Sequence, residues 1–283
     1  MNRIILIFID GVGIGTPDPA RNPFLHPDLA RLNQLLFTES RAVDVGMGVA
    51  GLPQSATGQT ALLTGINAAR ALGTHREGFP NRELKAIIQE HNIFRQFKDR
   101  GLKSTFANAY RTRSLEEIKY QSVTTIATFC AFGEVRGLED LKNGRAVYQD
   151  PTNQFLADEG FSVPVISPEK AGENLAALAG ENHLTLYEYF QTDRAGHSRD
   201  IQTALVVLKE LQVFLSVVVE RTDLQETLLM ITSDHGNIED LSVKAHTGNP
   251  VPLVARGWKS EEVLSGIGEI TAVTPTLVQL PFD

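Results

Sequence analysis

Hydrophobic residues along the chain form two kinds of pattern. Short, nearly unbroken apolar runs that stop at a polar residue or glycine are typical of buried strands in a parallel sheet. Such runs predict strands at residues 3–9, 42–45, 103–109, 184–190, 228–232 and 253–255. Apolar residues that recur within longer segments, many at three- and four-residue steps, predict helices at residues 27–36, 81–100, 200–221 and 272–280.

The succession of these elements predicts an α/β fold with a mostly parallel sheet. Residues 111–181 have a different texture, because they hold alternating Thr, Ile, Ala and Phe residues, a charged turn and a tail broken by proline and glycine. We expect this block to be a small inserted cap. The core would then consist of residues 1–110 and 182–283.

The composition narrows the classes of partner. The net charge of −8 and the isoelectric point near 5.4 argue against nucleic acid and against an anionic membrane. The apolar run at residues 4–9 is too short for a signal peptide, and no other stretch approaches the roughly 20 apolar residues that span a bilayer. The single cysteine, Cys130, permits no intrachain disulfide, and its apolar context favours a place in the core. We therefore expect a cytoplasmic protein, whose oligomeric state the sequence leaves open.

Acidic residues and histidines follow three of the expected strands. Asp10 ends the first run, and Asp234 with His235 ends the run at residues 228–232. Ligands of open α/β sheets bind at the carboxyl ends of the strands, where these side chains would lie. An Asp-His dipeptide alone is also compatible with an ordinary hydrogen-bonded pair.

Two further segments favour a metal site over an isolated pair. Asp193 and His197 follow the strand expected at residues 184–190. They are four residues apart, a spacing that places both on one face of a helical turn. His246 lies in the loop before the strand at residues 253–255. Three carboxylates and three imidazoles are too many ligands for one ion and enough for two. Mixed oxygen and nitrogen ligands favour Zn²⁺ or Mn²⁺ over Ca²⁺, with Mg²⁺ as a further candidate.

The segment at residues 51–65 carries a hydroxyl that suits phosphoryl transfer. Pro53 and Ser55 stand where a helix is expected to begin, and the positive end of a helix favours an anion. Ser55 is therefore a candidate nucleophile, and the alternative is a plain N-cap of the helix.

The motifs together resemble the alkaline phosphatase superfamily of two-metal enzymes. The segments Thr-Ser-Asp-His-Gly-Asn at 232–237 and His-Thr-Gly-Asn-Pro-Val-Pro at 246–252 are most similar to the branch of cofactor-independent phosphoglycerate mutase and phosphopentomutase. Residues 55–65 are similar to the nucleophile segment of alkaline phosphatase itself. The sulfatase branch is less similar, because its modified Cys or Ser with a Pro/Arg signature is missing here.

The resemblance implies a three-layer core and a set of site residues. One metal would be held by Asp193, His197 and His246. The second metal would be held by Asp10, Ser55, Asp234 and His235, with Ser55 transiently phosphorylated. In this superfamily the cap selects the substrate. The expected cap at residues 111–181 is shorter than the phosphotransferase domain of the glycerate mutase.

We therefore expect a phosphomonoesterase that acts on a small phosphorylated metabolite through a phosphoserine intermediate. The alternative is a phosphomutase that uses the same serine, and a phosphodiesterase or a non-catalytic metal-binding protein is less favoured. Candidate substrate contacts are Thr57, His75, Arg76 and Arg111.

Overall fold

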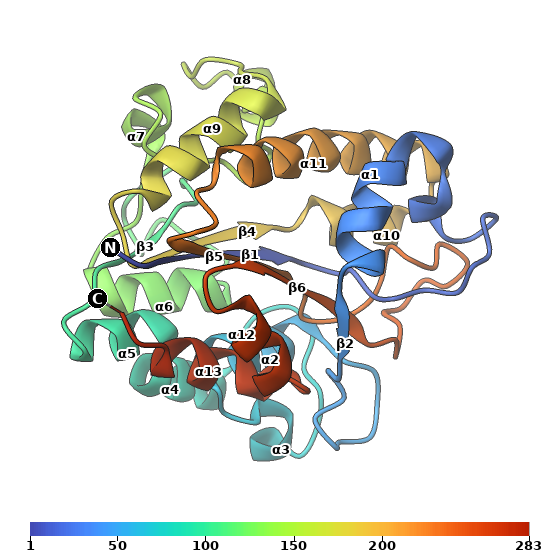
Figure 1. Cartoon of the computed structure of the whole chain (residues 1–283), viewed down its shortest axis with the longest axis horizontal. Helices are drawn as coiled ribbons and strands as arrows, with labels where there is room; N and C mark the ends of the chain where they lie inside the picture. Colours follow the sequence, from blue (N-terminus) through green and yellow to red (C-terminus); the bar gives the residue numbers. More distant parts are fainter. Residues whose placement is uncertain (283) are drawn as a thin grey trace.

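The structure, a computed structural model, describes residues 1–282 and is built on one six-stranded sheet (Figure 1). The strands are β1 (Arg3–Ile9), β2 (Arg41–Val43), β3 (Ser104–Phe106), β4 (Leu184–Tyr189), β5 (Thr227–Thr232) and β6 (Val251–Gly257). Their order across the sheet is β2-β6-β5-β1-β4-β3. β1 pairs in parallel with β4 and β5, β3 pairs in parallel with β4, and β6 runs antiparallel to its neighbours. The expected α/β fold with a mostly parallel sheet is confirmed.

Both faces of the sheet are buried because alternate side chains of the central strands point to opposite faces. In β1, Ile4, Leu6 and Phe8 belong to one apolar cluster, and the residues between them belong to another. One face is covered mainly by α2 (Ser55–Thr64), α4 (Arg82–His91), α5 (Ile93–Asp99), α6 (Val123–Phe132), α12 (Ser260–Gly266) and α13 (Val273–Gln279). The other is covered mainly by α1 (Ala30–Asn33), α9 (Pro168–Ala179), α10 (Gln191–Ser198) and α11 (Ile201–Arg221). The result is a three-layer arrangement of helices, sheet and helices.

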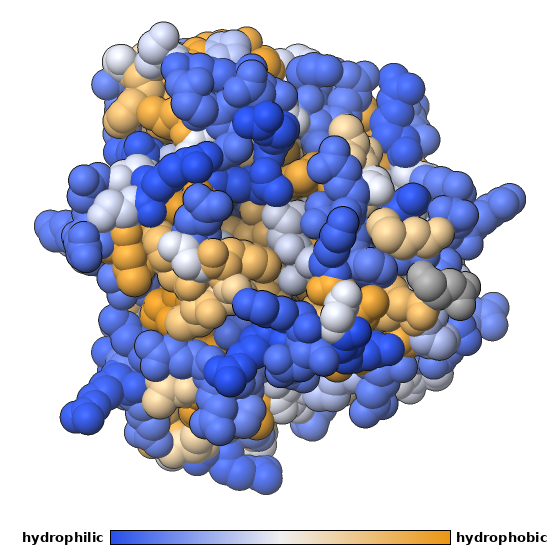
Figure 2. Space-filling model, turned by 90° about the vertical axis from the view of Figure 1, so that its left-hand side faces the viewer, coloured by the Kyte–Doolittle hydropathy of each residue, from blue (hydrophilic) through white to orange (hydrophobic). Residues whose placement is uncertain are grey.

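Shorter elements connect these layers. They are the single-turn or short segments η1 (Pro23–Leu25), η2 (Pro27–Leu29), η3 (Gln34–Thr38), η4 (Ile270–Ala272), α3 (Ala68–Leu72), α7 (Leu138–Lys142) and α8 (Gln154–Asp158). Figure 2 shows the side of the molecule where both termini lie, with hydrophobic patches among mainly hydrophilic residues. β1 begins on this side, so the carboxyl ends of the parallel strands lie at the opposite side.

The single helix expected at residues 81–100 is two helices. Asn92 separates α4 from α5 with an extended backbone (φ −63°, ψ 150°). Its side-chain oxygen accepts a hydrogen bond from Arg95 N (3.0 Å), and its Nδ2 donates to Ile88 O (2.9 Å). Asn92 therefore ends one helix and caps the next, a break that the continuous apolar spacing conceals.

Part of the block at residues 111–181 lies in the helical layers. α6 packs against α4 and α5, and α9 packs against α11. α7 and α8 lie farther from the sheet (Figure 1), and the connections around them enclose a small separate cluster of Ala109, Leu141, Ala146, Tyr148 and Leu156. The division into core and cap stays a prediction, but α6 and α9 are structurally continuous with the layers on the sheet.

Two expectations about apolar segments are corrected. α11 is long and apolar enough, by length and composition, to cross a membrane, whereas the sequence suggested no such stretch. In the structure α11 packs along α9 and buries Leu208, Leu211 and Phe214 in the core, as a helix that covers a sheet does. Cys130 is exposed rather than in the core, because it lies on the outer side of α6.

The double role of Asn92 predicts a large loss of stability on truncation. Asn92→Ala removes a helix cap and a buried hydrogen bond, so the free energy of unfolding should fall by about 2 kcal/mol. Asn81→Ala is the matched control, because Asn81 caps α4 through one hydrogen bond to Leu84 N (3.0 Å) and should lose only about 1 kcal/mol. Urea denaturation measures both values. An equal or smaller loss for Asn92→Ala would contradict the double role.

Candidate metal centre

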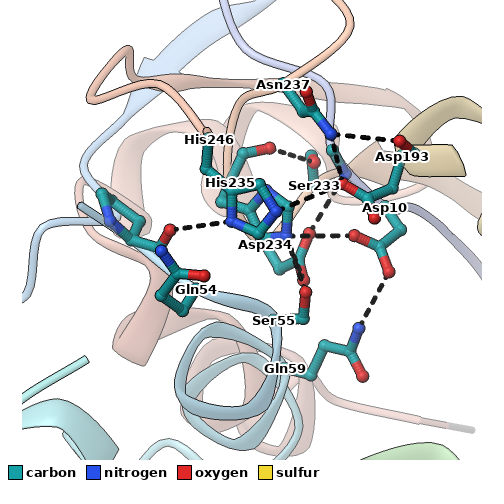
Figure 3. A network of polar contacts seen from close by, with 12 residues as sticks. Asp10, Gln54, Ser55, Gln59, Asp193, Ser233, Asp234, His235, Asn237 and His246 are labelled. Carbon is teal, nitrogen blue, oxygen red and sulfur yellow. Dashed lines mark hydrogen bonds and ion pairs between the residues drawn. The ribbon is translucent and has the colours of Figure 1, made fainter. Parts of the chain in front are cut away.

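The carboxyl ends of three neighbouring strands bring the expected ligands together. β5, β1 and β4 are adjacent in the sheet, and they lead to Asp234, Asp10 and Asp193 respectively. Figure 3 shows these acids facing His235, His246 and Ser55 across a small volume. All seven residues expected to bind metal therefore lie in one place, and their roles as ligands stay predictions.

The first group contains Asp10, Asp234 and His235, whose candidate ligand atoms lie within 4.8 Å of one another. The Nε2 atom of His235 is 2.9 Å from Ser55 Oγ, 3.2 Å from Asp10 Oδ1 and 3.5 Å from Asp234 Oδ2. One ring nitrogen carries at most one proton and cannot satisfy three oxygen atoms. Such a convergence of lone pairs is what a divalent cation requires.

The second group contains Asp193, His197 and His246, with candidate ligand atoms again within 4.8 Å. Asp193 and His197 lie one turn apart on α10, as their spacing predicted, with His197 Nε2 3.4 Å from Asp193 Oδ2. The Nε2 of His246 is 3.2 Å from the Nε2 of His197 and 3.5 Å from Asp193 Oδ1. Two imidazole nitrogens therefore meet beside one carboxylate.

The histidine rings are held so that their Nε2 atoms face the two groups. The rings of His235 and His246 stack at 3.8 Å between centroids with an interplanar angle of 14°, which makes the groups neighbours. Each Nδ1 lies near a backbone carbonyl oxygen: His235 with Gly236 (3.3 Å), His197 with Lys244 (3.3 Å) and His246 with Pro53 (3.2 Å). A proton on Nδ1 that is donated to a carbonyl leaves the lone pair on Nε2, which is the tautomer that binds metal.

Burial makes the carboxylates of the first group costly to ionise without a cation. Burial, and then the neighbouring carboxylate of Asp234, raise the pKa of Asp10 well above its ordinary value. Burial also raises the pKa of Asp234, although His235 opposes the shift. Asp10 Oδ1 and Asp234 Oδ2 are buried and accept no hydrogen bond from residues 1–282. These two oxygens and the imidazole beside them fit a divalent metal ion.

The carboxylate of the second group behaves differently. Burial raises the pKa of Asp193, but contacts with His246, His235 and Asn237 outweigh it and lower the pKa to about 2. Asn237 Nδ2 donates to Asp193 Oδ1 (2.6 Å) and to Asp193 O (3.0 Å). Asp193 is therefore charged near neutral pH and held in a fixed orientation, which also fits a metal ligand.

Ser55 does not cap α2. The N-cap position is Gln54, the helix starts at Ser55, and no side-chain cap bond is formed. The Ser55 hydroxyl lies beside His235 instead, so the N-cap interpretation is wrong. α2 approaches the first metal group through Gly58, where a Cβ atom would lie only 2.7 Å from Asp234 O. Glycine at this position lets the positive end of the helix stand next to the acids.

Three residues that the sequence analysis did not single out support the site. Glu239 is fully buried and accepts hydrogen bonds from Gly13 N (2.9 Å) and Asn237 N (2.7 Å), and its other oxygen accepts from Asn249 Nδ2 (3.0 Å). It therefore ties together the loops after β1 and β5 and the loop before β6. Gln59 Nε2 on α2 donates to Asp10 Oδ2 (3.1 Å), and Asn237 holds Asp193 as described above.

Glu188 is a fourth residue that sequence reasoning missed. It lies near the end of β4, is buried, and accepts a hydrogen bond from Thr124 Oγ1 of α6 (2.5 Å). Burial raises its pKa to about 7, and Asp234 adds to the rise while Thr124 reduces it. A charged residue inside an otherwise apolar strand was the available signal.

The candidate substrate contacts are distributed around two adjoining cavities. The first has a volume of about 510 Å³ and is lined in part by Ser55, Asp193 and Arg111. The second, of about 540 Å³, is lined in part by Ser55 and Arg76. Neither cavity has Thr57 or His75 among its lining residues.

Thr57 and His75 support the loop instead. The Thr57 hydroxyl is fully buried, donates to Gln54 O (3.1 Å) and accepts from Arg76 N (3.2 Å). His75 Nε2 lies 3.2 Å from Val49 O. Both residues shape the chain next to Ser55, and direct contact with a substrate stays a prediction that these positions do not favour.

Curated relatives are similar to part of the chain. The 2,3-bisphosphoglycerate-independent phosphoglycerate mutase of Cereibacter sphaeroides is 29% identical over 153 residues, which are 50% of this chain and 30% of the mutase. The mutase of the same name from Yersinia pestis is 29% identical over 126 residues, or 41% of this chain and 24% of the mutase. The matched region thus spans less than a third of these relatives.

Solved structures are similar over the whole chain. The PH0037 protein of Pyrococcus horikoshii has a TM-score of 0.59 at 16% identity and covers 100% of this chain and 98% of its own. The alkaline phosphatase of the Antarctic bacterium TAB5 has a TM-score of 0.55 at 12% identity, with coverage of 98% and 97%. The alkaline phosphatase of a Shewanella species has a TM-score of 0.56 at 13% identity, with coverage of 99% and 100%. At sequence identities this low, the similarity to these structures shows a shared fold and does not show a shared activity.

The family assignment rests on a match that runs almost from end to end. The sequence profile of the Metalloenzyme superfamily matches residues 2–280, which include every strand and both groups of candidate ligands. The alkaline-phosphatase-like fold agrees with that match. The chain belongs to the Metalloenzyme superfamily, whose relatives include metal-dependent phosphatases and phosphomutases.

Proposed function

We propose that this protein is a metal-dependent phosphomonoesterase that transfers the phosphoryl group of a small ester to Ser55 and then to water. The observation that carries the proposal is the position of the Ser55 hydroxyl, 2.9 Å from His235 Nε2 and at the first residue of α2. A nucleophilic oxygen at a positive helix end, beside two groups of acids and imidazoles, suits attack on a phosphate.

Two divalent ions, when bound, supply Lewis-acid activation of the Ser55 hydroxyl and stabilise charge on the phosphoryl oxygens. One would be held by Asp10, Asp234 and His235 with Ser55, and the other by Asp193, His197 and His246. The orphaned oxygens of Asp10 and Asp234 support the first position.

The protein's own residues carry the positioning. Gln59 fixes Asp10, Asn237 fixes Asp193, and Glu239 ties together the loops after β1 and β5 and the loop before β6. The Ser55 hydroxyl gives its proton to solvent water as its Oγ bonds to phosphorus, and the bond between phosphorus and the ester oxygen breaks as that oxygen takes a proton from water. Water then attacks the phosphoserine, which restores the Ser55 hydroxyl and releases inorganic phosphate.

A phosphomutase with the same serine is the second candidate. It is favoured by the similarity of half of the chain to phosphoglycerate mutases. A mutase must hold the dephosphorylated substrate beside phosphoserine and exclude water. The part of residues 111–181 that lies outside the helical layers, around α7 and α8, is small, with a cluster of only a few buried residues. A small cover gives water access, so we favour hydrolysis.

Metal content tests the cofactor proposal. Elemental analysis of the purified protein should find about two divalent ions per chain, and chelation should abolish phosphate release. Asp234→Asn and His246→Ala should each lose about one ion. His91→Ala is the matched control, because the partly exposed His91 belongs to neither group of candidate ligands, and this variant should keep both ions. Full turnover by the chelated protein would refute the metal-dependent mechanism.

Ser55→Ala tests the nucleophile. Activity should fall at least about a thousandfold. The free energy of unfolding should change by less than about 1 kcal/mol, because Ser55 makes no cap bond. Thr57→Ala should show the opposite pattern, since its buried hydroxyl bonds the backbone on both sides. Initial rates and urea denaturation give both quantities. An active Ser55→Ala with an inactive Thr57→Ala would move the nucleophile to Thr57.

The products of turnover decide between hydrolase and mutase. Inorganic phosphate should appear in step with loss of the ester, because water reaches the phosphoserine. Added glycerol or Tris should capture part of the phosphoryl group. Phosphorus NMR of the reaction mixture measures these products together. Isomerisation of a sugar phosphate or phosphoglycerate with little free phosphate would instead establish the mutase.

A further inference from the structure

The cavity of about 510 Å³ beside Ser55 has an unusually aromatic wall for a site that handles a phosphate. Six aromatic side chains line it: Phe79, Phe106, Tyr110, Tyr120, Tyr148 and Phe190. They come from the segments around residues 79, 106–120, 148 and 190, which are far apart in the sequence. Ser55, Asp10 and Asp193 line the same cavity, so the aromatic wall and the proposed phosphoryl site share one space.

The polar side chains of this cavity are already engaged with the protein. Asn108 donates from Nδ2 to Glu188 O (2.7 Å) and accepts at Oδ1 from Glu188 N (2.9 Å). The Tyr110 hydroxyl is paired with Thr125 Oγ1 at 2.9 Å. Both side chains are therefore held by the protein and are less available to a ligand.

Two cations line the cavity, Arg111 and Arg194, and Arg194 lies over the ring of Phe155. Arg111 forms an ion pair with Glu159 (2.8 Å), donates from Nε to Tyr148 (3.3 Å), and lies over the rings of Phe155 and Phe161. A carboxylate such as that of a glycerate would have to displace Glu159 to bind it. The ion pair of Arg111 and the aromatic wall therefore favour an alcohol portion with a flat aromatic group over a glycerate.

Phe79 and Tyr120 form the most exposed part of the wall. Their rings stack at 5.1 Å between centroids with an interplanar angle of 18°, and the residues are 46% and 60% exposed. Exposed stacked rings at the rim of a cavity offer flat apolar surface to a ligand. The volume also falls within the range of about 300–1,000 Å³ that small-molecule sites show, whereas a glycerate would leave much of the apolar wall in contact with water.

We infer that this cavity binds the alcohol portion of a phosphate monoester that carries a flat aromatic group, such as the base of a nucleoside monophosphate. The aromatic group packs against the wall that ends at Phe79 and Tyr120, and the phosphate reaches Ser55. This inference rests on the proposed function for the role of Ser55, but the aromatic wall can be tested by binding alone.

The decisive comparison uses two esters that differ only in the aromatic group. Adenosine 5′-monophosphate and ribose 5-phosphate share the same phosphate and the same ester oxygen. Their dissociation constants are measured by calorimetry on the Mn²⁺-supplemented Ser55→Ala protein, which cannot turn them over. Stacking of a base on an aromatic side chain predicts at least about tenfold tighter binding of the adenosine ester. The contribution of the phosphate cancels in the ratio.

Variants of the rim separate aromatic recognition from a general loss of the site. Tyr120→Leu and Phe79→Leu, each in the Ser55→Ala background, keep an apolar side chain and should reduce the affinity ratio several-fold, mainly through the adenosine ester. Val206→Ala is the control, because Val206 of α11 is also 60% exposed and does not line the cavity. Equal affinities of the two esters, tighter binding of 3-phosphoglycerate, or no measurable binding of the adenosine ester would overturn the inference.

Phosphate release by the wild-type protein is measured in parallel, so that the two proposals can fail separately. Metal-dependent release from both esters with equal affinities would leave the proposed function intact and refute the aromatic wall as a recognition surface. A tenfold affinity ratio without release of phosphate from either ester would refute the hydrolase and support the binding site.

Discussion

Three carboxylates at one edge of the sheet, two of them buried and one half-buried, impose the main physical constraint on this structure. Asp10, Asp193 and Asp234 follow adjacent strands, and burial together with the neighbouring carboxylates raises the pKa values of Asp10 and Asp234. The Nε2 atoms of the neighbouring histidines face these carboxylates. One Nε2 atom carries at most one proton, so the histidines cannot donate a hydrogen bond to every carboxylate oxygen. Cations bound at the two groups would offset the free-energy cost of placing these carboxylates together.

The need to hold these acids explains several features around them. Glu239 is buried and has no cationic partner among the described residues. Its oxygens accept hydrogen bonds from two backbone amides and from side-chain donors, which satisfies the buried carboxyl group. Gly58 lets α2 approach Asp234, and Gly11, with φ +73°, lets the turn after β1 approach Asp193 to a distance that a Cβ atom would block. Packing and polar contacts therefore both hold the segments after β1 and β5, where Asp10 and Asp234 lie.

The sequence predicted the strands, and the residues that gather at their carboxyl ends, for a common reason. A parallel strand that is buried on both faces is a continuous apolar run, and a functional acid at its end interrupts the run visibly, as Asp10 and Asp234 do. The helix break at Asn92 was missed because hydrophobic periodicity does not reveal a cap inside a helical segment. Cys130 was wrongly placed in the core because periodicity does not show which way a single small side chain points. Glu188, Asn237 and Glu239 were missed because their partners are loops or helices that only the folded chain brings near.

The candidate metal centre and the aromatic wall share one cavity but draw mainly on different parts of the chain. The centre uses the ends of the sheet strands, where position is fixed by hydrogen bonds between strands. The cavity wall uses segments around residues 79, 106–120, 148 and 190, and those around 79, 111–120 and 148 are loops that can change without disturbing the strand ends. The mutases are similar to only part of this chain, and the matched region is less than a third of their length. The similarity to the mutases therefore does not identify a substrate, and the wall that this chain itself provides is the more direct observation.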